Sequence, residues 1–326
     1  MSRARPRGGG NPRSGTPGTA PGWSRACGAG RHGASLARVD DPGGDADDRG
    51  RRARDALAGG RFVDIRWVEE TGSTNADVLE LARGGEAAGT VVVAERQTAG
   101  RGRRGRTWEA PAGAALTFTI LLRPRASVAG LATMAAAVAA AEAVESLAGV
   151  RPALKWPNDL VWPGDGSGPD RKLAGILAEA EWPPGATASG GWTRPTTERV
   201  AVAVGIGLNV AWRGRFPAEL VDVAVSLDEL TAPSGPPDRV DLLVALVRRL
   251  DELDRSLETD GGPEALRAAW AGRSATIGRR VRVDLGADDV VGTAVDLTAE
   301  GHLVVETVEG ERRVLAVGDV VHLRDR

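Results

Sequence analysis

The sequence predicts an α+β fold, in which a mixed, largely antiparallel sheet backed by helices is followed by a small β-barrel. Two observations lead to this expectation. Between residues 62 and 270, short β-branched or alternating runs typical of strands are interspersed with longer segments that carry apolar residues at helical spacing. Residues 275–326 contain five or six short strand-like runs separated by Gly-containing turns, the pattern of a small barrel.

The N-terminal stretch, residues 1–58, is rich in Gly, Pro, Arg and Ser and has almost no Leu, Ile, Val or Phe. Such a segment cannot bury enough apolar surface to offset the conformational entropy lost on folding. We therefore expect a disordered tail over 1–58, a main domain over 59–272 and a barrel domain over 273–326. No helix-turn-helix is expected in the tail, because it has no helical apolar period.

The first ordered elements are a strand over residues 62–68 and a helix that begins near Thr74 and stops at Gly84-Gly85. Thr74 and Asp77 have the spacing of a capping box, which places Ser73, Thr74 and Asn75 at the helix N-terminus. That end carries free N–H groups and a partial positive charge, so it suits a polar ligand. A plain helix cap explains Thr74 equally well.

Residues 97–108 lie between two predicted strands, 90–94 and 114–122, and read Gln-Thr-Ala-Gly-Arg-Gly-Arg-Arg-Gly-Arg-Thr-Trp. The glycines permit close approach of the backbone to a ligand, and the arginines supply fork-shaped donors for carboxylate or phosphate. The segment therefore predicts an anion-binding loop. By composition alone, a solvated hairpin end or a nucleic-acid patch is an equally good explanation.

A buried helix is expected over residues 127–147, and a strand pair follows over 153–162. Within this apolar and aromatic pair stand Lys155, Asn158 and Asp159. Polar groups in such surroundings must be satisfied by one another or by a ligand. Pro157 ends or bulges the first strand and redirects the residues after it.

The strand expected over residues 171–179 opens with Arg171 and Lys172, and a Pro/Gly/Thr-rich insertion follows to about residue 198. The next strand runs into Gly-Ile-Gly-Leu-Asn at 205–209, where alternating glycines allow a ligand or another backbone to approach. Amphipathic helices are expected over 241–257 and 263–270. The barrel after residue 272 carries no evident catalytic cluster, and a stabilising cap and a docking module explain it equally well.

Composition excludes several classes of protein. The net charge of −2 and the pI of about 6.1 give no overall attraction to DNA or an anionic membrane. One Cys and three His are too few for a zinc site or a disulfide framework, which fits a reducing cytoplasm. We expect no secretory signal and no apolar run long enough to span a membrane.

Five motifs, taken together, resemble those of the biotin-protein ligases in order and spacing. They are Ser-Thr-Asn at 73–75, the loop at 97–108, Lys-Trp-Pro-Asn-Asp at 155–159, Arg-Lys-Leu-Ala-Gly-Ile at 171–176 and Gly-Ile-Gly-Leu-Asn at 205–209. The resemblance covers about residues 62–323. It implies the class II synthetase-like biotin/lipoate ligase fold with an SH3-like C-terminal barrel. Bifunctional relatives carry a DNA-binding helix-turn-helix at the N-terminus, so its absence here implies a monofunctional ligase without specific DNA binding.

The resemblance implies a two-step reaction. The carboxylate of biotin attacks the α-phosphate of ATP to give biotinyl-5′-AMP and diphosphate, and a lysine of an acceptor protein then takes the biotinyl group and releases AMP. ATP and biotin are the substrates and Mg²⁺ assists. The acceptor is the biotin carboxyl carrier domain of a biotin-dependent carboxylase; no membrane partner is implied, and the chain is a monomer or a homodimer.

The resemblance also assigns residues to roles. Arg103 and Lys172 flank the reacting carboxylate and phosphate, and Asp159 is a further catalytic candidate that accepts the proton of the incoming lysine and contacts Mg²⁺ through water or phosphate. The residues implied for biotin are Ser73, Thr74, Asn75, Gln97, Gly100, Arg101, Arg103, Lys172 and Gly175. Those implied for ATP and the adenylate are Arg103, Arg104, Arg106, Trp108, Asn158, Lys172 and Asn209.

Three other functions are compatible with parts of the sequence. A lipoate or octanoate ligase or transferase has a related catalytic fold, although the arginine loop and the 155–159 motif fit biotin better. A nucleic-acid-binding module would use Arg101 and its neighbours, but the acidic net charge and the missing reader helix argue against it. A catalytically inactive regulator is disfavoured because Arg103 and Lys172 are both present.

Overall fold

The structure is a computed structural model that describes residues 44–163, 169–181, 198–286 and 288–323. Its main sheet has seven strands in the order β1-β2-β3-β7-β6-β5-β4. The strands are β1 (Asp64–Thr71), β2 (Thr90–Gln97), β3 (Ala115–Leu122), β4 (Ala153–Lys155), β5 (Asp159–Trp162), β6 (Arg171–Glu181) and β7 (Ala201–Asn209). Only the β1–β2 pair is parallel. The predicted mixed, largely antiparallel sheet is thus confirmed.

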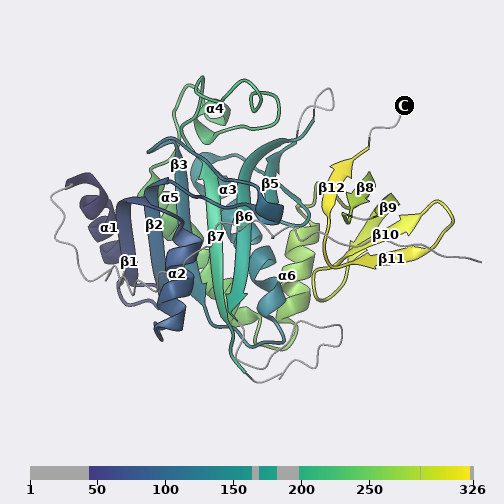
Figure 1. The fold of residues 1–326 in the computed structure, drawn as a ribbon, viewed down its shortest axis with the longest axis horizontal. Helices are drawn as coiled ribbons and strands as arrows, with labels where there is room; N and C mark the ends of the chain where they lie inside the picture. Colours follow the sequence, from purple (N-terminus) through teal and green to yellow (C-terminus); the bar gives the residue numbers. More distant parts are fainter. Residues whose placement is uncertain (1–43, 164–168, 182–197, 287, 324–326) are drawn as a thin grey trace, which may run out of the picture. The chain divides into compact units, whose positions relative to one another are not determined.

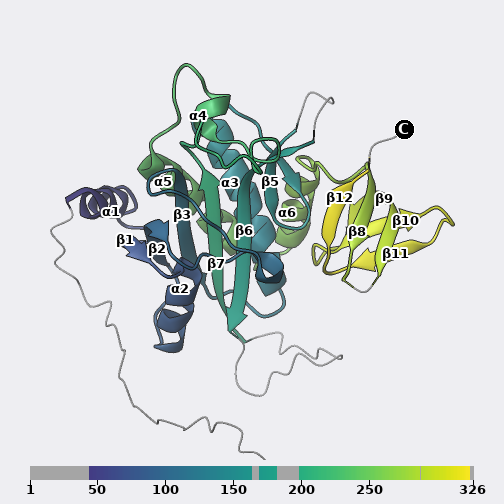
Figure 2. The same cartoon turned by 45° about the horizontal axis from the view of Figure 1, so that its top comes forward.

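Helices cover the sheet on both faces (Figures 1 and 2). The α2 helix (Thr74–Arg83) lies on one face, and α3 (Ala132–Ala148), α5 (Arg239–Ser256) and α6 (Gly262–Ala271) form a layer on the other. Two short 3₁₀ turns, η1 (Arg103–Gly105) and η2 (Ala129–Leu131), and the short α4 (Leu227–Leu230) complete this part. The sheet therefore has one face under a thick helical layer and one face only partly covered.

Strands β3 and β7 divide their side chains between these two faces. Phe118 of β3 and Ile206 of β7 are paired and buried in the core under the helical layer. Their neighbours Thr119 and Gly205, also paired, point to the α2 face, because successive residues of a strand alternate sides. The α2 face near the middle of the sheet is consequently lined by small and polar residues, which leaves room above it.

The first described helix, α1 (Gly44–Ala56), corrects the expectation of disorder over 1–58. Ala46, Ala53 and Leu57 are buried against the main core. Arg54 donates from Nη1 to the carbonyl oxygen of Ile65 on β1 at 2.7 Å. These apolar residues share one helical face although the segment is mostly charged, so its average composition was misleading. Residues 1–43 of the predicted tail lie outside the described residues.

The C-terminal strands form one antiparallel sheet in the order β11-β10-β9-β8-β12. They are β8 (Arg280–Asp284), β9 (Asp289–Leu297), β10 (Leu303–Thr307), β11 (Arg312–Leu315) and β12 (Asp319–His322). Trp156, just after β4, donates from Nε1 to the carbonyl oxygen of Gly301 at 3.0 Å. Five or six strands were expected for the small barrel, and five are present. This sheet (yellow in Figure 1) packs beside the β4–β5 end of the main sheet.

The α3 helix corrects one further expectation. The segment Ala129–Ala148 is long and apolar enough to cross a membrane, contrary to the expectation that no apolar run reaches this length. About two thirds of this segment, 67%, is buried inside the protein, and α3 packs between the sheet and α5, so it is the central helix of the core. The insertion predicted after Glu181 falls at 182–197, outside the described residues.

Candidate active site

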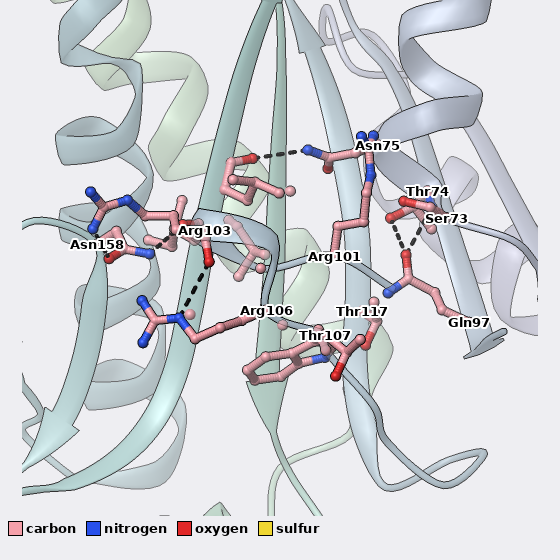
Figure 3. A pocket seen from close by; sticks show the side chains of 18 of the residues that line it. Ser73, Thr74, Asn75, Gln97, Arg101, Arg103, Arg106, Thr107, Thr117 and Asn158 are labelled. Atoms are coloured by element: carbon pink, nitrogen blue, oxygen red, sulfur yellow. Dashed lines mark hydrogen bonds between the residues drawn. The ribbon is translucent and has the colours of Figure 1, made fainter. Parts of the chain in front are cut away.

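A cavity of about 120 Å³ lies on the α2 face of the main sheet, above β3, β7 and β6 and beneath the loop that follows β2. Eleven residues predicted for substrate binding line it: Ser73, Thr74, Asn75, Gln97, Arg101, Arg103, Arg106, Trp108, Asn158, Lys172 and Gly175. These residues come from four separate stretches of sequence, which are the start of α2, the loop, the turn between β4 and β5, and β6 (Figure 3). The cavity is smaller than the usual range for ligand pockets, roughly 300–1,000 Å³.

The loop itself is a closed hairpin. The backbone N–H of Trp108 donates to the carbonyl of Gly100 at 3.0 Å, and that of Gly102 donates to the carbonyl of Arg106 at 2.6 Å. A Cβ on Gly100 would lie 2.2 Å from the Trp108 carbonyl oxygen, so only glycine fits there. Arg104 adopts a left-handed conformation with φ 54°, which turns the chain at the tip. Gly100 thus shapes the hairpin, and it is absent from the cavity lining.

The N-terminus of α2 supplies the uncharged polar end of the cavity. Ser73 is the N-cap and makes no side-chain capping bond, so the predicted Thr74–Asp77 capping box is wrong. Instead, Gln97 accepts at Oε1 from the backbone N–H of Thr74 at 2.8 Å and from its hydroxyl at 3.1 Å. Asp77 accepts from the Thr71 hydroxyl at 2.7 Å, and burial raises the pKa of its carboxyl.

The floor of this end is a network of hydrogen bonds across the sheet. The Thr119 hydroxyl lies 2.8 Å from that of Thr74 and 2.6 Å from Oδ1 of Asn75. Asn75 donates from Nδ2 to Oε2 of Glu179 at 2.8 Å. A Cβ on Gly205 would lie 2.0 Å from Oδ1 of Asn75, so this glycine makes room for the amide. Contacts with β3, β6 and β7 therefore fix the orientation of the Asn75 side chain.

The opposite end of the cavity is cationic. Arg103 donates from Nη1 to Oδ1 of Asn158 at 3.3 Å, and Asn158 donates from Nδ2 to the Ile176 carbonyl at 2.7 Å. Lys172 Nζ lies 2.7 Å from Oδ1 of Asp159, the only partner found for that buried oxygen in the described part of the chain. Figure 3 shows Arg103, Arg106 and Asn158 on one side of the cavity and Thr74, Asn75 and Gln97 on the other.

The C-terminal sheet reaches the arginine loop. Asp319, the first residue of β12, binds Arg103 through Oδ1 at 3.2 Å and Arg106 through Oδ2 at 2.9 Å. Arg104 donates from Nη2 to the carbonyl oxygen of Asp284 at 2.8 Å. Burial lowers the pKa of the Arg103 guanidinium, while Asp319 and Asp159 favour its charged form. A guanidinium remains protonated under these conditions, so Arg103 is a permanent cation.

Trp108 lies inside the cavity. A Cβ on Gly207 would be 2.3 Å from Cε2 of the indole, and one on Gly175 would be 3.4 Å from Cζ3, so both glycines make room for the ring. Lys172 Nζ lies 5.9 Å from the ring centroid, within range of a cation–π contact. The indole Nε1 is buried and has no hydrogen-bond partner among the described residues.

Four predicted site residues do not line the cavity: Gly100, Arg104, Asp159 and Asn209. Asn209 is buried and donates from Nδ2 to the carbonyls of Val225 at 3.1 Å and Lys172 at 3.3 Å. It therefore fastens the segment after residue 223 to β6, and the structure does not bring its side chain to the cavity. Arg104 faces the C-terminal sheet, and Asp159 reaches the site through Lys172.

Sequence reasoning overlooked several residues that the structure brings to the site. Thr117 and Thr119 alternate with Leu116, Phe118 and Ile120 along β3, a signal of a polar face that was available in the sequence. Glu179, on β6, touches both Asn75 and Arg101. Asp319 gave no comparable signal, because its contact with Arg103 spans 216 residues of sequence.

Metal binding can be judged from the donor set. The described residues contain no group of three or more His, Cys, Asp or Glu side chains placed to hold a metal ion. Asp159 offers one carboxylate oxygen with no hydrogen-bond donor, although it is ion-paired with Lys172. This fits an ion such as Mg²⁺ that arrives with nucleotide phosphates and keeps most of its water ligands, better than a metal held by protein side chains alone.

The cavity thus has one uncharged polar end and one cationic end, and the arginine hairpin covers it. Its polar end suits a neutral ring. Its cationic end suits a carboxylate and a nucleotide phosphate. Comparison with known proteins identifies the class. Residues 68–188 match the model of the biotin/lipoate A/B protein ligase family, and residues 276–323 match that of the biotin protein ligase C-terminal domain.

More closely related proteins narrow the class. Over 284 residues the chain is 39% identical to the biotin–[acetyl-CoA-carboxylase] ligase of Mycobacterium tuberculosis, which covers 84% of this chain and 95% of that ligase. It is 32% identical to the bifunctional ligase/repressor BirA of Escherichia coli. That match covers 77% of this chain and 70% of BirA. The chain belongs to the biotin protein ligase family.

A solved structure shows the same fold. The biotin protein ligase from Aquifex aeolicus, solved in complex with biotin and ATP, superposes with a TM-score of 0.63 and 26% sequence identity. The match covers 81% of this chain and 100% of the other. The fold and family implied by the five sequence motifs are thus confirmed.

Proposed function

We propose that this chain activates biotin with ATP and transfers it to a lysine of a biotin carboxyl carrier domain. The observation that carries this proposal is the difference in polarity between the two ends of the cavity above β3, β6 and β7. Ser73, Thr74 and Gln97 offer uncharged donors and acceptors at one end, and Arg103 and Lys172 offer cations at the other. Biotin has the matching shape, because its ureido ring is neutral and its tail ends in a carboxylate.

The first step joins two anions, so the residues must neutralise charge and hold the reactants in line. Arg103 and Lys172 flank the biotin carboxylate and the α-phosphate. A carboxylate oxygen attacks the α-phosphorus, the bond to the bridging oxygen breaks, and diphosphate leaves. No proton transfer is needed, which fits a site built from cations and amides.

The second step is aminolysis of the mixed anhydride. The ε-amine of the acceptor lysine attacks the carbonyl carbon of biotinyl-5′-AMP, the acyl–phosphate bond breaks, and AMP leaves. The amine must lose a proton as the amide forms, and the Asp159 carboxylate lies at the cationic end, 2.7 Å from Lys172 Nζ. We assign proton acceptance to Asp159.

Trp108 and the remaining predicted residues are assigned to the adenylate. The indole is held over Gly207 and Gly175, where it presents a flat face suited to stacking on adenine. Arg106 and Asn158 line the cationic end and would face phosphate oxygens. Mg²⁺, held by the phosphates, water and Asp159, would supply charge neutralisation of the leaving diphosphate.

The acceptor and the setting follow from the same proposal. The acceptor is a biotin carboxyl carrier domain of a biotin-dependent carboxylase, and the enzyme works in the cytoplasm. We propose a catalytic domain over 59–272, against which α1 also packs, and a C-terminal domain over 273–326. The proposed enzyme is a monofunctional ligase that does not bind specific DNA, and it is a monomer or homodimer. The relative covered to 95% of its length is named as a ligase alone, which supports this assignment.

The test is ATP–diphosphate exchange that depends on an added acid, comparing biotin, lipoate and octanoate, with Arg103→Ala as the control. We expect exchange with biotin alone, lost in the variant. Incubation with a biotin carboxyl carrier domain should then add one biotinyl group to one lysine, seen by intact mass. Exchange with lipoate or octanoate but not biotin would overturn the proposal in favour of a lipoate-type ligase.

A further inference from the structure

Glu179 of β6 lies beside the uncharged end of the cavity without lining it. Its Oε2 accepts from Nδ2 of Asn75 at 2.8 Å and from Nη2 of Arg101 at 3.1 Å. Arg101 does line the cavity, and Figure 3 shows it on the same side as Asn75, away from Arg103 and Arg106. Glu179 thus joins the floor of the polar end to the loop that covers it.

The charges of the four loop arginines are balanced by two different groups of partners. Arg103, Arg104 and Arg106 turn to Asp319 and Asp284 of the C-terminal sheet. Arg101 alone turns the other way, and Glu179 is its only ion-pair partner among the described residues. Glu179 therefore cancels the one positive charge that the loop places at the polar end.

The Arg101–Glu179 pair remains open to solvent, since the side chains are 46% and 28% exposed. A small anion could reach Arg101 if its partner were neutral. An Arg guanidinium with no carboxylate partner is a strong site for another carboxylate. Without Glu179, both ends of the cavity would attract an acid.

Specificity often depends on what a site rejects as much as on what it attracts. We propose that Glu179 is a specificity-determining residue that keeps the ring end of the cavity electrically neutral, so that an acid binds only with its carboxylate toward Arg103 and Lys172. The proposal rests on the proposed function, because it assumes that the bound substrate is a neutral ring with one carboxylate. Glu179 acts through Arg101 and does not touch substrate.

The geometry allows a clean substitution. Glu179→Gln keeps an acceptor oxygen for Asn75, which is buried and also bound by Thr119, while it removes the charge that pairs with Arg101. The adjacent outward-facing carboxylate on the same face of β6, Glu181, pairs with Arg83 of α2 at 2.8 Å and is absent from the cavity lining. Glu181→Gln is therefore the matched control.

The test compares octanoate with octanedioate as inhibitors of biotin-dependent ATP–diphosphate exchange. The two acids have the same chain length, and only the second carries a carboxylate at its far end. The measured quantity is the inhibition constant of octanedioate divided by that of octanoate. We expect this ratio to be at least about fivefold lower in Glu179→Gln than in the wild type. Glu181→Gln should keep the wild-type ratio.

Arg101 provides the second test. In the double variant Glu179→Gln/Arg101→Gln the ratio should return to the wild-type value, because the uncovered cation is gone. The proposal would be overturned if Glu179→Gln kept the wild-type ratio of the two inhibition constants, or if octanedioate did not inhibit it at all. It would also be overturned if the double variant still bound octanedioate as tightly as Glu179→Gln does. Absence of biotin-dependent exchange in the wild-type protein would instead overturn the proposed function, so the two failures are distinguishable.

Discussion

Arg103 of the loop after β2 and Asp319 of β12 form an ion pair of 3.2 Å that crosses from the main sheet to the C-terminal sheet. The same carboxylate binds Arg106 at 2.9 Å. Two of the cations that line the cavity are therefore held by a residue more than two hundred positions away in the sequence. The C-terminal sheet helps to hold the cations of the site, which favours a role beyond stabilising the main domain.

Asp319→Asn should weaken catalysis with little effect on stability. Arg103 would lose the partner that fixes its direction, and a misdirected cation stabilises the transition state less. We expect kcat/KM for biotin-dependent exchange to fall about tenfold, equivalent to about 1.4 kcal/mol.

The matched control for that variant is Asp289→Asn. Asp289 forms an exposed pair with Arg282 at 3.5 Å on the same sheet and does not reach the loop. Its variant should retain wild-type exchange. Equal activity of Asp319→Asn and wild type would show that the C-terminal carboxylate does not position Arg103.

Lys172→Met should nearly abolish adenylation. The substitution removes the ammonium that lies beside Asp159 at the cationic end, and it leaves that carboxylate facing the reacting anions. We expect exchange to fall by about 100- to 1,000-fold, the usual effect of removing one preorganised transition-state contact. Arg83→Gln, which removes an exposed cation on α2, should stay within about twofold of wild type. Substantial residual exchange in Lys172→Met would mean that Arg103 alone supplies the charge.

Gly205→Ala should disturb the polar end of the cavity from below. The added Cβ would meet Oδ1 of Asn75 at 2.0 Å, so the amide has to move. We expect a loss of stability of about 1–3 kcal/mol and a KM for biotin raised at least about tenfold. Gly72→Ala, one residue before the N-cap of α2, adds a Cβ to open space and should leave both quantities unchanged. Thermal unfolding measures the stability of the two variants, and exchange kinetics measure their KM for biotin. Equal values for the two variants would contradict the prediction.

His322 makes stability depend on pH. The imidazole is half-buried beside Asp170, Arg279 and Lys155, and this burial together with the two cations lowers its pKa to about 4. The unfolded chain takes up a proton near pH 6.5 and the folded chain only near 4, so stability declines as the pH falls through this window. Solvent screens these interactions because the ring is only partly buried, so the effect stays below about 3 kcal/mol.

The variant that tests this effect is His322→Gln, which has no titrating group. Its free energy of unfolding, measured by urea titration, should change less between pH 7 and pH 5 than that of the wild type. Parallel curves for the two proteins would contradict the assignment of the slope to His322.

The sequence predicted the elements of the site better than their contacts. Motifs such as 97–108 and 155–159 combine glycines or prolines with charges in apolar surroundings, and such local conflicts are visible in a linear sequence. The structure brings eleven of the predicted residues to one cavity. Asn209 was misleading because a buried amide that ties two backbone segments together has the same sequence context as one that faces a ligand.

Other features could not be predicted from local patterns. The α1 helix has only a few small apolar residues, and it is held through contacts such as that of Arg54 with Ile65, which depend on the position of β1. The capping of α2 by Gln97 is likewise tertiary, since Thr74 and Gln97 are 23 residues apart. The partners of side-chain amides and carboxylates depend on which residues the fold brings near them. Local sequence patterns do not show which residues those are.

Strands β3 and β7 carry the floor of the cavity and the centre of the hydrophobic core on alternate residues. Inserting or deleting a single residue in either strand would therefore exchange the two sets of side chains. The side chain of Phe118 or Ile206 would turn toward α2, and a threonine or glycine would turn toward the core. New acid specificities are accordingly more accessible by changing side chains on the α2 face than by altering strand length. Residues such as Thr117 can vary in size, whereas the length of the strands that present them cannot.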